Sequence, residues 1–81
     1  MGTEAKVRTF IVDELGFVGP AEDLVVDYPL LAREVLDSMG IFQLVAFLEH
    51  DFGILIDDED LVPENFESIG SIARFVGAKQ G

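Results

Sequence analysis

The chain has 81 residues, 49% of them hydrophobic, no cysteine and a formal net charge of −11. This length and hydrophobic content predict one small domain over residues 1–81 and exclude a wholly disordered chain, while the missing thiols exclude a disulfide framework or a cysteine zinc site. The negative charge argues against nucleic acid as a partner, because phosphates would be repelled, and favours a basic patch on another protein, although acidity also serves solubility alone.

Residues 3–15 are predicted to form the first helix. Thr3 is expected to cap its start, and Gly16 to stop it. Lys6 and Arg8 should decorate its exposed side. Hydrophobic residues recur at helical spacing, at Val7, Phe10, Ile11 and Leu15.

Residues 16–37 are predicted to form a long connection, because Gly19-Pro20 and Tyr28-Pro29 break helical continuation. The segment is rich in leucine and valine, so we expect it to pack over the core, with a short helical turn near Leu30–Arg33. A connection this long in so small a domain usually has a structural or functional reason.

Residues 38–52 are predicted to form the second helix, which Gly53 ends. We expect Phe42 and Phe47 in the core or at its edge. On a helical wheel, the apolar side of this segment carries Ile41, Leu44, Val45, Leu48 and Phe52. The opposite side carries Met39, Gln43, Ala46 and His50.

Residues 54–81 are predicted to hold one short and one long helix. The acidic run Asp57–Asp60 reads as a solvated loop, and Pro63 should start a short helix through Phe66. Ser68 should cap the last helix, and Ala78–Gly81 should fray. No strand pattern appears, so the expected fold class is all-α: three main helices and one short helix in a bundle with a long first loop.

The sharpest local motif is Leu36–Ile41, which reads Leu-Asp-Ser-Met-Gly-Ile. It places the hydroxyl of Ser38 at the amino end of a helix after a long loop, where unpaired backbone N–H groups and the helix dipole favour a phosphate. Taken alone, ordinary N-capping by Asp37 or Ser38 is the commoner explanation of such a stretch.

The wider pattern resembles the phosphopantetheine-dependent carrier protein family, in its discrete form. The resemblance covers nearly the whole chain in the family's element order. The matching stretches are Asp27–Leu31, Val35–Met39, Leu44-Val45 through Phe52–Ile54, Ile56-Asp57, Asn65-Phe66 and Ser68-Ile69 with Ile72.

The resemblance implies an acyl-carrier-like four-helix bundle whose Ser38 carries 4'-phosphopantetheine through a phosphodiester, with Asp37 as the flanking motif residue. The implied function is carriage rather than catalysis: an aminoacyl or acyl group is held as a thioester on the long arm and presented to successive enzymes. The cofactor supplies the thiol that this chain lacks. In this family the bundle core can also admit an acyl chain.

The residues themselves do not favour a self-activating serine. The single histidine, His50, follows Ser38 by twelve residues, which in a helix is on the order of 18 Å. Ser38 therefore lacks the adjacent base of a hydrolase nucleophile, so no catalytic residue is expected and a separate transferase must activate the hydroxyl.

No metal site is expected. The acidic run Asp57–Asp60 invites a calcium interpretation, but an EF-hand needs glycine at loop position six and glutamate at position twelve. Counting from Asp57 gives Val62 and Ser68, so the motif fails. Weak binding of a divalent cation by clustered carboxylates stays open, beside a plain solvated loop.

A partner-recognition face is expected on the second helix. An uncharged strip with an acidic rim suits a transient docking site. The expected contact residues are Met39, Phe42, Gln43, Ala46, Glu49 and His50, with Asp37 at the edge. The resemblance implies these partners: a phosphopantetheinyl transferase, an adenylation enzyme or acyltransferase, and downstream condensing or tailoring enzymes.

The cargo is less closely defined by the pattern. Gly40 and Gln43 look like discrete aminoacyl carriers, and Pro63–Ile69 looks like free-standing carriers of specialised (natural product) biosynthesis. The alternatives are an acyl carrier of fatty-acid or polyketide synthesis, a D-alanyl carrier or, from another class, a small acidic helical interaction module without cofactor.

The expected location is the cytoplasm, and the expected state is a monomer. No run is long and apolar enough to span a membrane, and the N-terminus lacks a signal-peptide pattern.

Overall fold

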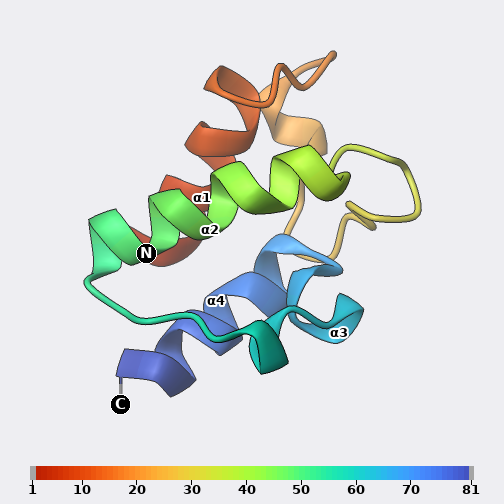
Figure 1. Cartoon of the computed structure of the whole chain (residues 1–81). Helices are drawn as coiled ribbons and strands as arrows, with labels where there is room; N and C mark the ends of the chain where they lie inside the picture. The colour runs from red at the N-terminus through yellow and green to blue at the C-terminus, as the bar shows by residue number, and fades with distance from the viewer. Residues whose placement is uncertain (1, 81) are drawn as a thin grey trace.

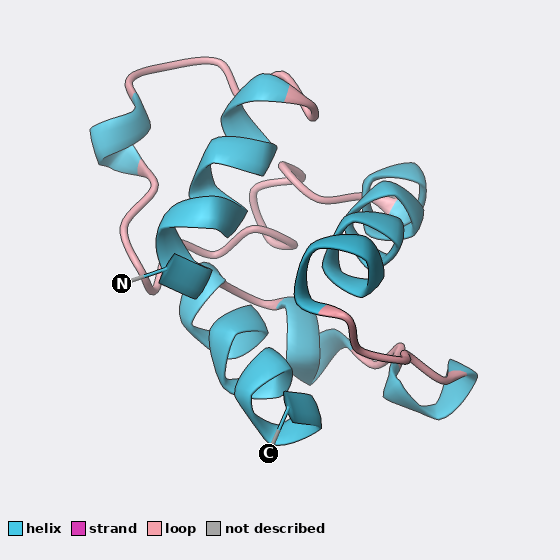
Figure 2. Cartoon of the chain, turned by 90° about the vertical axis from the view of Figure 1, so that its left-hand side faces the viewer, coloured by secondary structure: helices cyan, strands magenta, loops and turns pink. Residues whose placement is uncertain are grey.

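The computed structural model describes residues 2–80, which form four α-helices and two short 3₁₀ turns with no strand among them (Figures 1 and 2). The helices pass around one core, with α2 crossing in front of α1 in Figure 1 and α4 running below. The predicted all-α class is confirmed. In chain order the elements are α1 (Gly2–Asp13), η1 (Ala21–Asp23), α2 (Ser38–Phe52), η2 (Asp58–Asp60), α3 (Pro63–Phe66) and α4 (Ile69–Gln80).

One hydrophobic core joins the helices to the loops. Its buried side chains come from every α-helix and from the two long connections. Helix α1 packs against α4. Leu44 and Leu48, on the predicted apolar side of α2, are fully buried. Within residues 2–80, no helix has the length and apolarity needed to cross a lipid bilayer. The buried core residues are Val7, Ile11, Leu24, Leu30, Leu36, Leu44, Leu48, Ile54, Phe66, Ile69, Ile72, Phe75 and Val76.

The predicted helix boundaries differ from the structure at both ends of α1 and at the end of α4, and agree with it at the start of α4. The first helix begins at Gly2 and ends at Asp13, so Thr3 lies within it and does not cap it. The last helix begins after Ser68, whose Oγ accepts a hydrogen bond from the Ser71 N–H at 3.1 Å, as a capping residue does. It continues to Gln80 where fraying was expected; Met1 and Gly81 lie outside the described residues.

Two side-chain placements also differ from the sequence-based prediction. Arg8 does not simply decorate the surface, because its Nε donates a 2.9 Å hydrogen bond to the carbonyl oxygen of Leu24 and ties the connection to α1. Phe42 was expected in the core or at its edge, but 69% of it is exposed, because it lies on the outward side of α2. Phe47 is partly buried against the core, as predicted.

The connection between α1 and α2 is held by main-chain hydrogen bonds to the C-terminal half. The N–H of Leu30 donates to the carbonyl oxygen of Glu67 at 2.8 Å, and the N–H of Gly70 donates to that of Val26 at 2.9 Å. Gly70 allows this close approach, since a Cβ there would lie 2.8 Å from a methyl of Val26. The turn predicted near Leu30–Arg33 is present, with the Arg33 N–H bonded to the Pro29 carbonyl.

The end of this connection contains a strained residue. Glu34 has φ of 59°, and it is the one non-glycine residue with positive φ within residues 2–80. The left-handed region crowds the Cβ of an ordinary residue against the following carbonyl. The turn is imposed because the N–H groups of Val35 and Leu36 both donate to the Leu30 carbonyl, at 2.9 and 3.2 Å.

The acidic segment after α2 is anchored rather than simply solvated. Asp60 pairs with Lys79 of α4, with 2.6 Å between Oδ2 and Nζ, and its carboxylate also accepts the N–H of Asp57 at 2.9 Å. The hydrogen bond from Lys79 lowers the pKa of Asp60 below its ordinary 3.8, and the same contact raises the pKa of Lys79 above 10.5. This pair explains why α4 stays helical to its end.

Replacing Glu34 with glycine should stabilise the fold. Glu34→Gly removes the crowded Cβ at a positive φ, and the gain should exceed the added entropy of the unfolded chain, leaving about 0.5–1 kcal/mol. Urea denaturation followed by circular dichroism measures it. Ala32→Gly, two residues away at a position without positive φ, is the matched control and should destabilise; equal effects of the two variants would contradict the strain.

Replacing Asp60 with asparagine should destabilise the fold in a pH-dependent way. Asp60→Asn removes the charge but keeps an oxygen that can accept the Asp57 N–H. Because the pKa of Asp60 is lowered on folding, its contribution is complete above the unfolded value of 3.8 and is lost as the pH falls through the folded value. Thermal midpoints of the two proteins should therefore differ near pH 7 and converge near about pH 2. Asp58→Asn, in the same turn but without an ion pair within residues 2–80, should shift the midpoint less at both pH values.

Candidate functional site

Ser38 is the first residue of α2, and its side chain is exposed. Asp37 precedes it in an extended conformation and caps the helix, because its Oδ1 accepts the Gly40 N–H at 2.8 Å. The capping expected of this stretch therefore belongs to Asp37. Ser38 therefore does not cap the helix, and it is exposed at the start of the helix.

Two backbone N–H groups at this helix start have no acceptor within residues 2–80. The N–H of Gly40 is used by the Asp37 side chain, and that of Ile41 by the Asp37 carbonyl at 2.8 Å. The N–H groups of Ser38 and Met39 remain for an outside acceptor. A phosphodiester on the Ser38 oxygen would lie beside these donors at the positive end of the helix dipole, so the residues fit an attached phosphate.

Gly40 has a packing role that the sequence did not reveal. It is buried, and a Cβ there would lie 3.3 Å from both Asp37 Oδ1 and a methyl of Leu36, and 3.6 Å from Leu15. A larger residue would press on the cap that holds the first turn of α2. Its small size is therefore explained by the cap, before any partner is considered.

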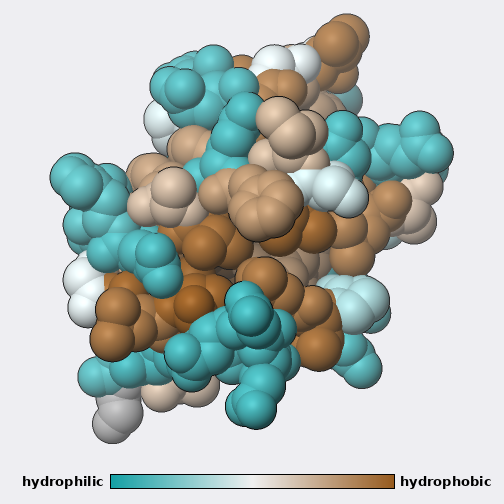
Figure 3. Space-filling view, viewed as in Figure 1, coloured by the Kyte–Doolittle hydropathy of each residue, from teal (hydrophilic) through white to brown (hydrophobic). Residues whose placement is uncertain are grey.

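An apolar groove begins at Ser38 and follows α2. It has a volume of about 370 Å³ and lies between α2 and the segment that contains η2. Figure 3 shows hydrophobic side chains gathered on this face, below α2. A second hollow, of about 430 Å³, opens on the other side of Ser38 and includes Glu34 and Asp37. The groove is lined by Ser38, Ile41, Phe42, Val45, Glu49, Ile56, Asp58 and Leu61.

The contacts of the Ser38 hydroxyl within residues 2–80 include no acid or base. No histidine or carboxylate within residues 2–80 forms a hydrogen bond to the Ser38 hydroxyl. His50 lies exposed near the far end of α2, with its Nδ1 3.3 Å from Asp51. The same residues contain no group of three or more possible metal-ligating side chains.

The predicted recognition face lies on one exposed side of α2, with one exception. Met39 and Phe42 are 67% and 69% exposed, and Gln43, Ala46 and His50 are exposed with them. Glu49 differs, because it is partly buried and its Oε2 accepts the Ile56 N–H at 2.9 Å. It therefore holds the groove's far wall as well as carrying charge, a role that sequence spacing could not indicate.

The comparisons with known proteins agree with this geometry. The phosphopantetheine attachment site family matches residues 5–76. An acyl carrier protein of Chlamydia trachomatis serovar D is 31% identical over 80 residues, which is 99% of each chain. One from Nitratidesulfovibrio vulgaris (strain DP4) is 33% identical over 60 residues, covering 74% of this chain and 76% of its own.

Two solved structures have the same fold. The solution structure of a holo acyl carrier protein from Nitrosomonas europaea superposes with a TM-score of 0.80 at 31% identity, covering 98% of this chain and 96% of that one. A chain in a crystal structure described as an FAD-dependent dehydrogenase superposes with a TM-score of 0.77, also at 31% identity. That chain is of similar size, since the match covers 86% of this chain and 97% of it.

Proposed function

Because this chain belongs to the phosphopantetheine attachment site family, and is therefore a carrier protein with 4'-phosphopantetheine as its prosthetic group, we propose that Ser38 is the attachment residue. The observation that carries the proposal is the geometry of the α2 start. An exposed hydroxyl adjoins two backbone N–H groups that have no acceptor within residues 2–80, and Asp37 rather than Ser38 caps the helix.

The residues around Ser38 bind and orient rather than catalyse. When attached, the cofactor supplies the thiol on which a carrier holds an acyl group. This chain contains no cysteine and so has no thiol of its own. Asp37 fixes the first turn, and the two donor N–H groups favour the phosphate. The partner enzyme must supply the base, because no base contacts the Ser38 hydroxyl within residues 2–80.

The groove beside Ser38 is the proposed resting place of the cargo. Ile41, Val45 and Leu61 give it apolar walls, and its 370 Å³ is open to solvent along one side. A small acyl or aminoacyl group with an apolar side chain would lose exposed surface there. The hydrogen bond between Glu49 and Ile56 keeps the far wall in place.

We propose an aminoacyl or acyl cargo in specialised, natural-product biosynthesis, in the cytoplasm. Gly40 and Gln43 support an aminoacyl cargo, since they resemble discrete aminoacyl carriers, D-alanyl carriers included, and the Pro63–Ile69 segment supports the pathway, since it resembles free-standing carriers of specialised biosynthesis. The alternative is an acyl carrier of fatty-acid or polyketide synthesis, and the Chlamydia and Nitratidesulfovibrio relatives, which are named acyl carrier proteins, support an acyl cargo. Loading by an adenylation enzyme rather than by an acyltransferase would distinguish the first from the second.

A tailoring partner is also proposed. The similar chain in the FAD-dependent dehydrogenase structure favours a flavin-dependent dehydrogenase that acts on the carried group. The order of reactions would then be activation and loading of the acid, followed by oxidation while the group is bound to the carrier.

Attachment can be tested by mass spectrometry of the intact protein. Incubation with coenzyme A, magnesium and a phosphopantetheinyl transferase should add one phosphopantetheine, and Ser38→Ala should abolish the addition because the proposed acceptor oxygen is removed. Circular dichroism should show unchanged helix content. Thr9→Ala, which removes an exposed hydroxyl on α1, is the matched control and should be modified normally. Modification of Ser38→Ala would sink the assignment, and an unmodified wild type would favour an interaction module without cofactor.

The recognition face can be tested by loading kinetics of the modified protein with its activating enzyme. Met39→Ala should lower kcat/KM about three- to tenfold at any salt concentration, because it removes exposed apolar contact area. Glu49→Gln should lower it about twofold, with the loss fading at high salt, since its oxygen can still accept the Ile56 N–H and only the charge is removed. Val18→Ala truncates an even more exposed apolar residue away from α2 and should load normally. The face is misassigned if Met39→Ala loads like Val18→Ala.

A further inference from the structure

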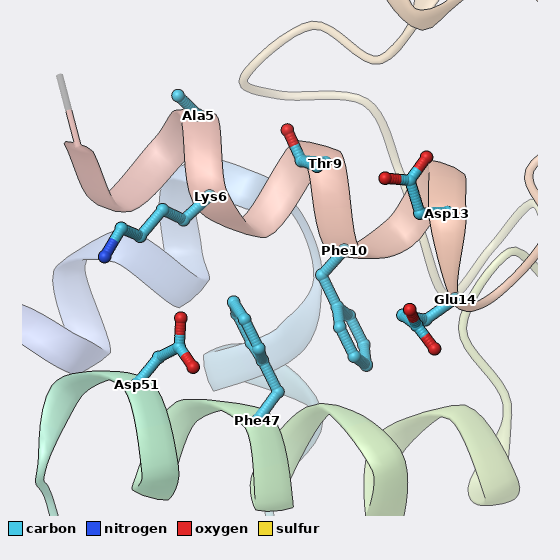
Figure 4. Close-up of a pocket in the computed structure, with 8 residues that line it drawn as sticks. All are labelled: Ala5, Lys6, Thr9, Phe10, Asp13, Glu14, Phe47 and Asp51. Atoms are coloured by element: carbon cyan, nitrogen blue, oxygen red, sulfur yellow. The ribbon is translucent and has the colours of Figure 1, made fainter.

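A second groove lies on the other flank of α2, between α1 and α2, and nothing in the function proposed above uses it. It has a volume of about 450 Å³ and is open to solvent. Figure 4 shows Phe10 and Phe47 projecting from the two helices into the space between them. Their rings stack with 4.5 Å between centroids and an interplanar angle of 18°, so the groove has an aromatic floor.

The two ends of this groove differ in charge. Asp13 and Glu14 lie at one end, and Asp51 lies at the other together with Lys6 (Figure 4). The Nζ of Lys6 lies over the Phe52 ring, 5.5 Å from the centroid, and its positive charge offsets that of Asp51. Within residues 2–80, neither Asp13 nor Glu14 forms an ion pair. The groove therefore offers negative charge to a partner at the Asp13 end.

The dimensions suit one kind of occupant. From Lys6 to Asp13 the groove follows α1 for seven residues, which is about 10 Å or two helical turns. An amphipathic helix of two to three turns would place two apolar side chains on the aromatic floor, and lysine or arginine at one of its ends would meet Asp13 and Glu14. A neutral or acidic helix would leave these carboxylates unpaired or repelled.

The groove also lies opposite the cargo site. Phe47 follows Ser38 by nine residues, and at about 100° per residue the two project from α2 in opposite directions, about 14 Å apart along the axis. The two grooves share no lining residue. A partner in the α1/α2 groove would therefore leave Ser38 and the groove beside it open to an enzyme.

We propose that the α1/α2 groove is a second docking surface, which binds a basic amphipathic helix of a partner protein while an enzyme acts on Ser38 or on the group attached to it. The groove's own binding does not depend on modification of Ser38. Only the simultaneous action of an enzyme at Ser38 rests on the proposed function. The measurements below test peptide binding and modification of Ser38 separately.

Binding is tested with a synthetic peptide of leucine and lysine in an amphipathic helical pattern, added to the full-length ¹⁵N-labelled protein at physiological salt. The amide signals of Thr9, Asp13 and Phe47 should move in a saturable way, and those of Met39 and Asp58 should not. Thr9→Trp, which fills the groove from an exposed position, should weaken binding about tenfold with an unchanged thermal midpoint. A peptide with glutamate in place of lysine should not bind.

Charge specificity needs a matched pair of variants. Glu14→Lys should weaken peptide binding about threefold or more, whereas Glu59→Lys changes net charge equally from an exposed position in η2 and should have little effect. Equal weakening by both variants, or signal changes centred on α2 near Met39, would overturn the docking surface. Finally, a saturating amount of peptide should leave the rate of Ser38 modification unchanged. Inhibition would overturn simultaneous use, while a protein that binds peptide but is never modified would overturn the attachment proposal alone.

Discussion

The position of Ser38 depends on how residues 14–37 are held, because this connection carries no α-helix of its own and yet delivers the start of α2. Three leucines, Leu24, Leu30 and Leu36, spaced six residues apart, enter the core at 0–2% exposure. Each such burial contributes roughly 1.5–3 kcal/mol. The Leu30 carbonyl then accepts two N–H groups and forces Glu34 into its left-handed turn. The loop is therefore anchored to the core by both side-chain burial and main-chain hydrogen bonds.

The two flanks of α2 have different characters because the helix has only one side in the core. Leu44 and Leu48 lie on the side that is buried in the core. The two flanks of α2 line separate grooves, one against α1 and one against the segment that contains η2. The flank with Ser38 is apolar and continuous with the η2 segment. The flank with Phe47 has an aromatic floor and one acidic end, at Asp13 and Glu14. A small carrier must meet several proteins, and a single exposed helix with two distinct flanks gives it more than one surface for doing so.

Polar contacts fix the segments that the core does not reach. Asp60 and Lys79 join the η2 turn to the end of α4, and Arg8 joins η1 to α1 through the Leu24 carbonyl. Glu49 holds the segment before η2 in place, because its carboxylate accepts a hydrogen bond from the Ile56 N–H. These contacts lie around the rim of the molecule, where a small core leaves little burial to supply rigidity.

The sequence alone determined the helix count, the bounds of α2, the buried side of α2 and the position of Ser38 at a helix start, because helical periodicity and capping residues are local signals. It also carried the family resemblance. Only the tertiary structure decided that Arg8 and Glu49 bind backbone groups sixteen and seven residues away, and that Asp60 pairs with Lys79. Each of these depends on how distant segments meet, which no periodic pattern records. The aromatic groove between α1 and α2 belongs to the same class, since Phe10 and Phe47 are ordinary core-edge residues until the two helices are laid side by side.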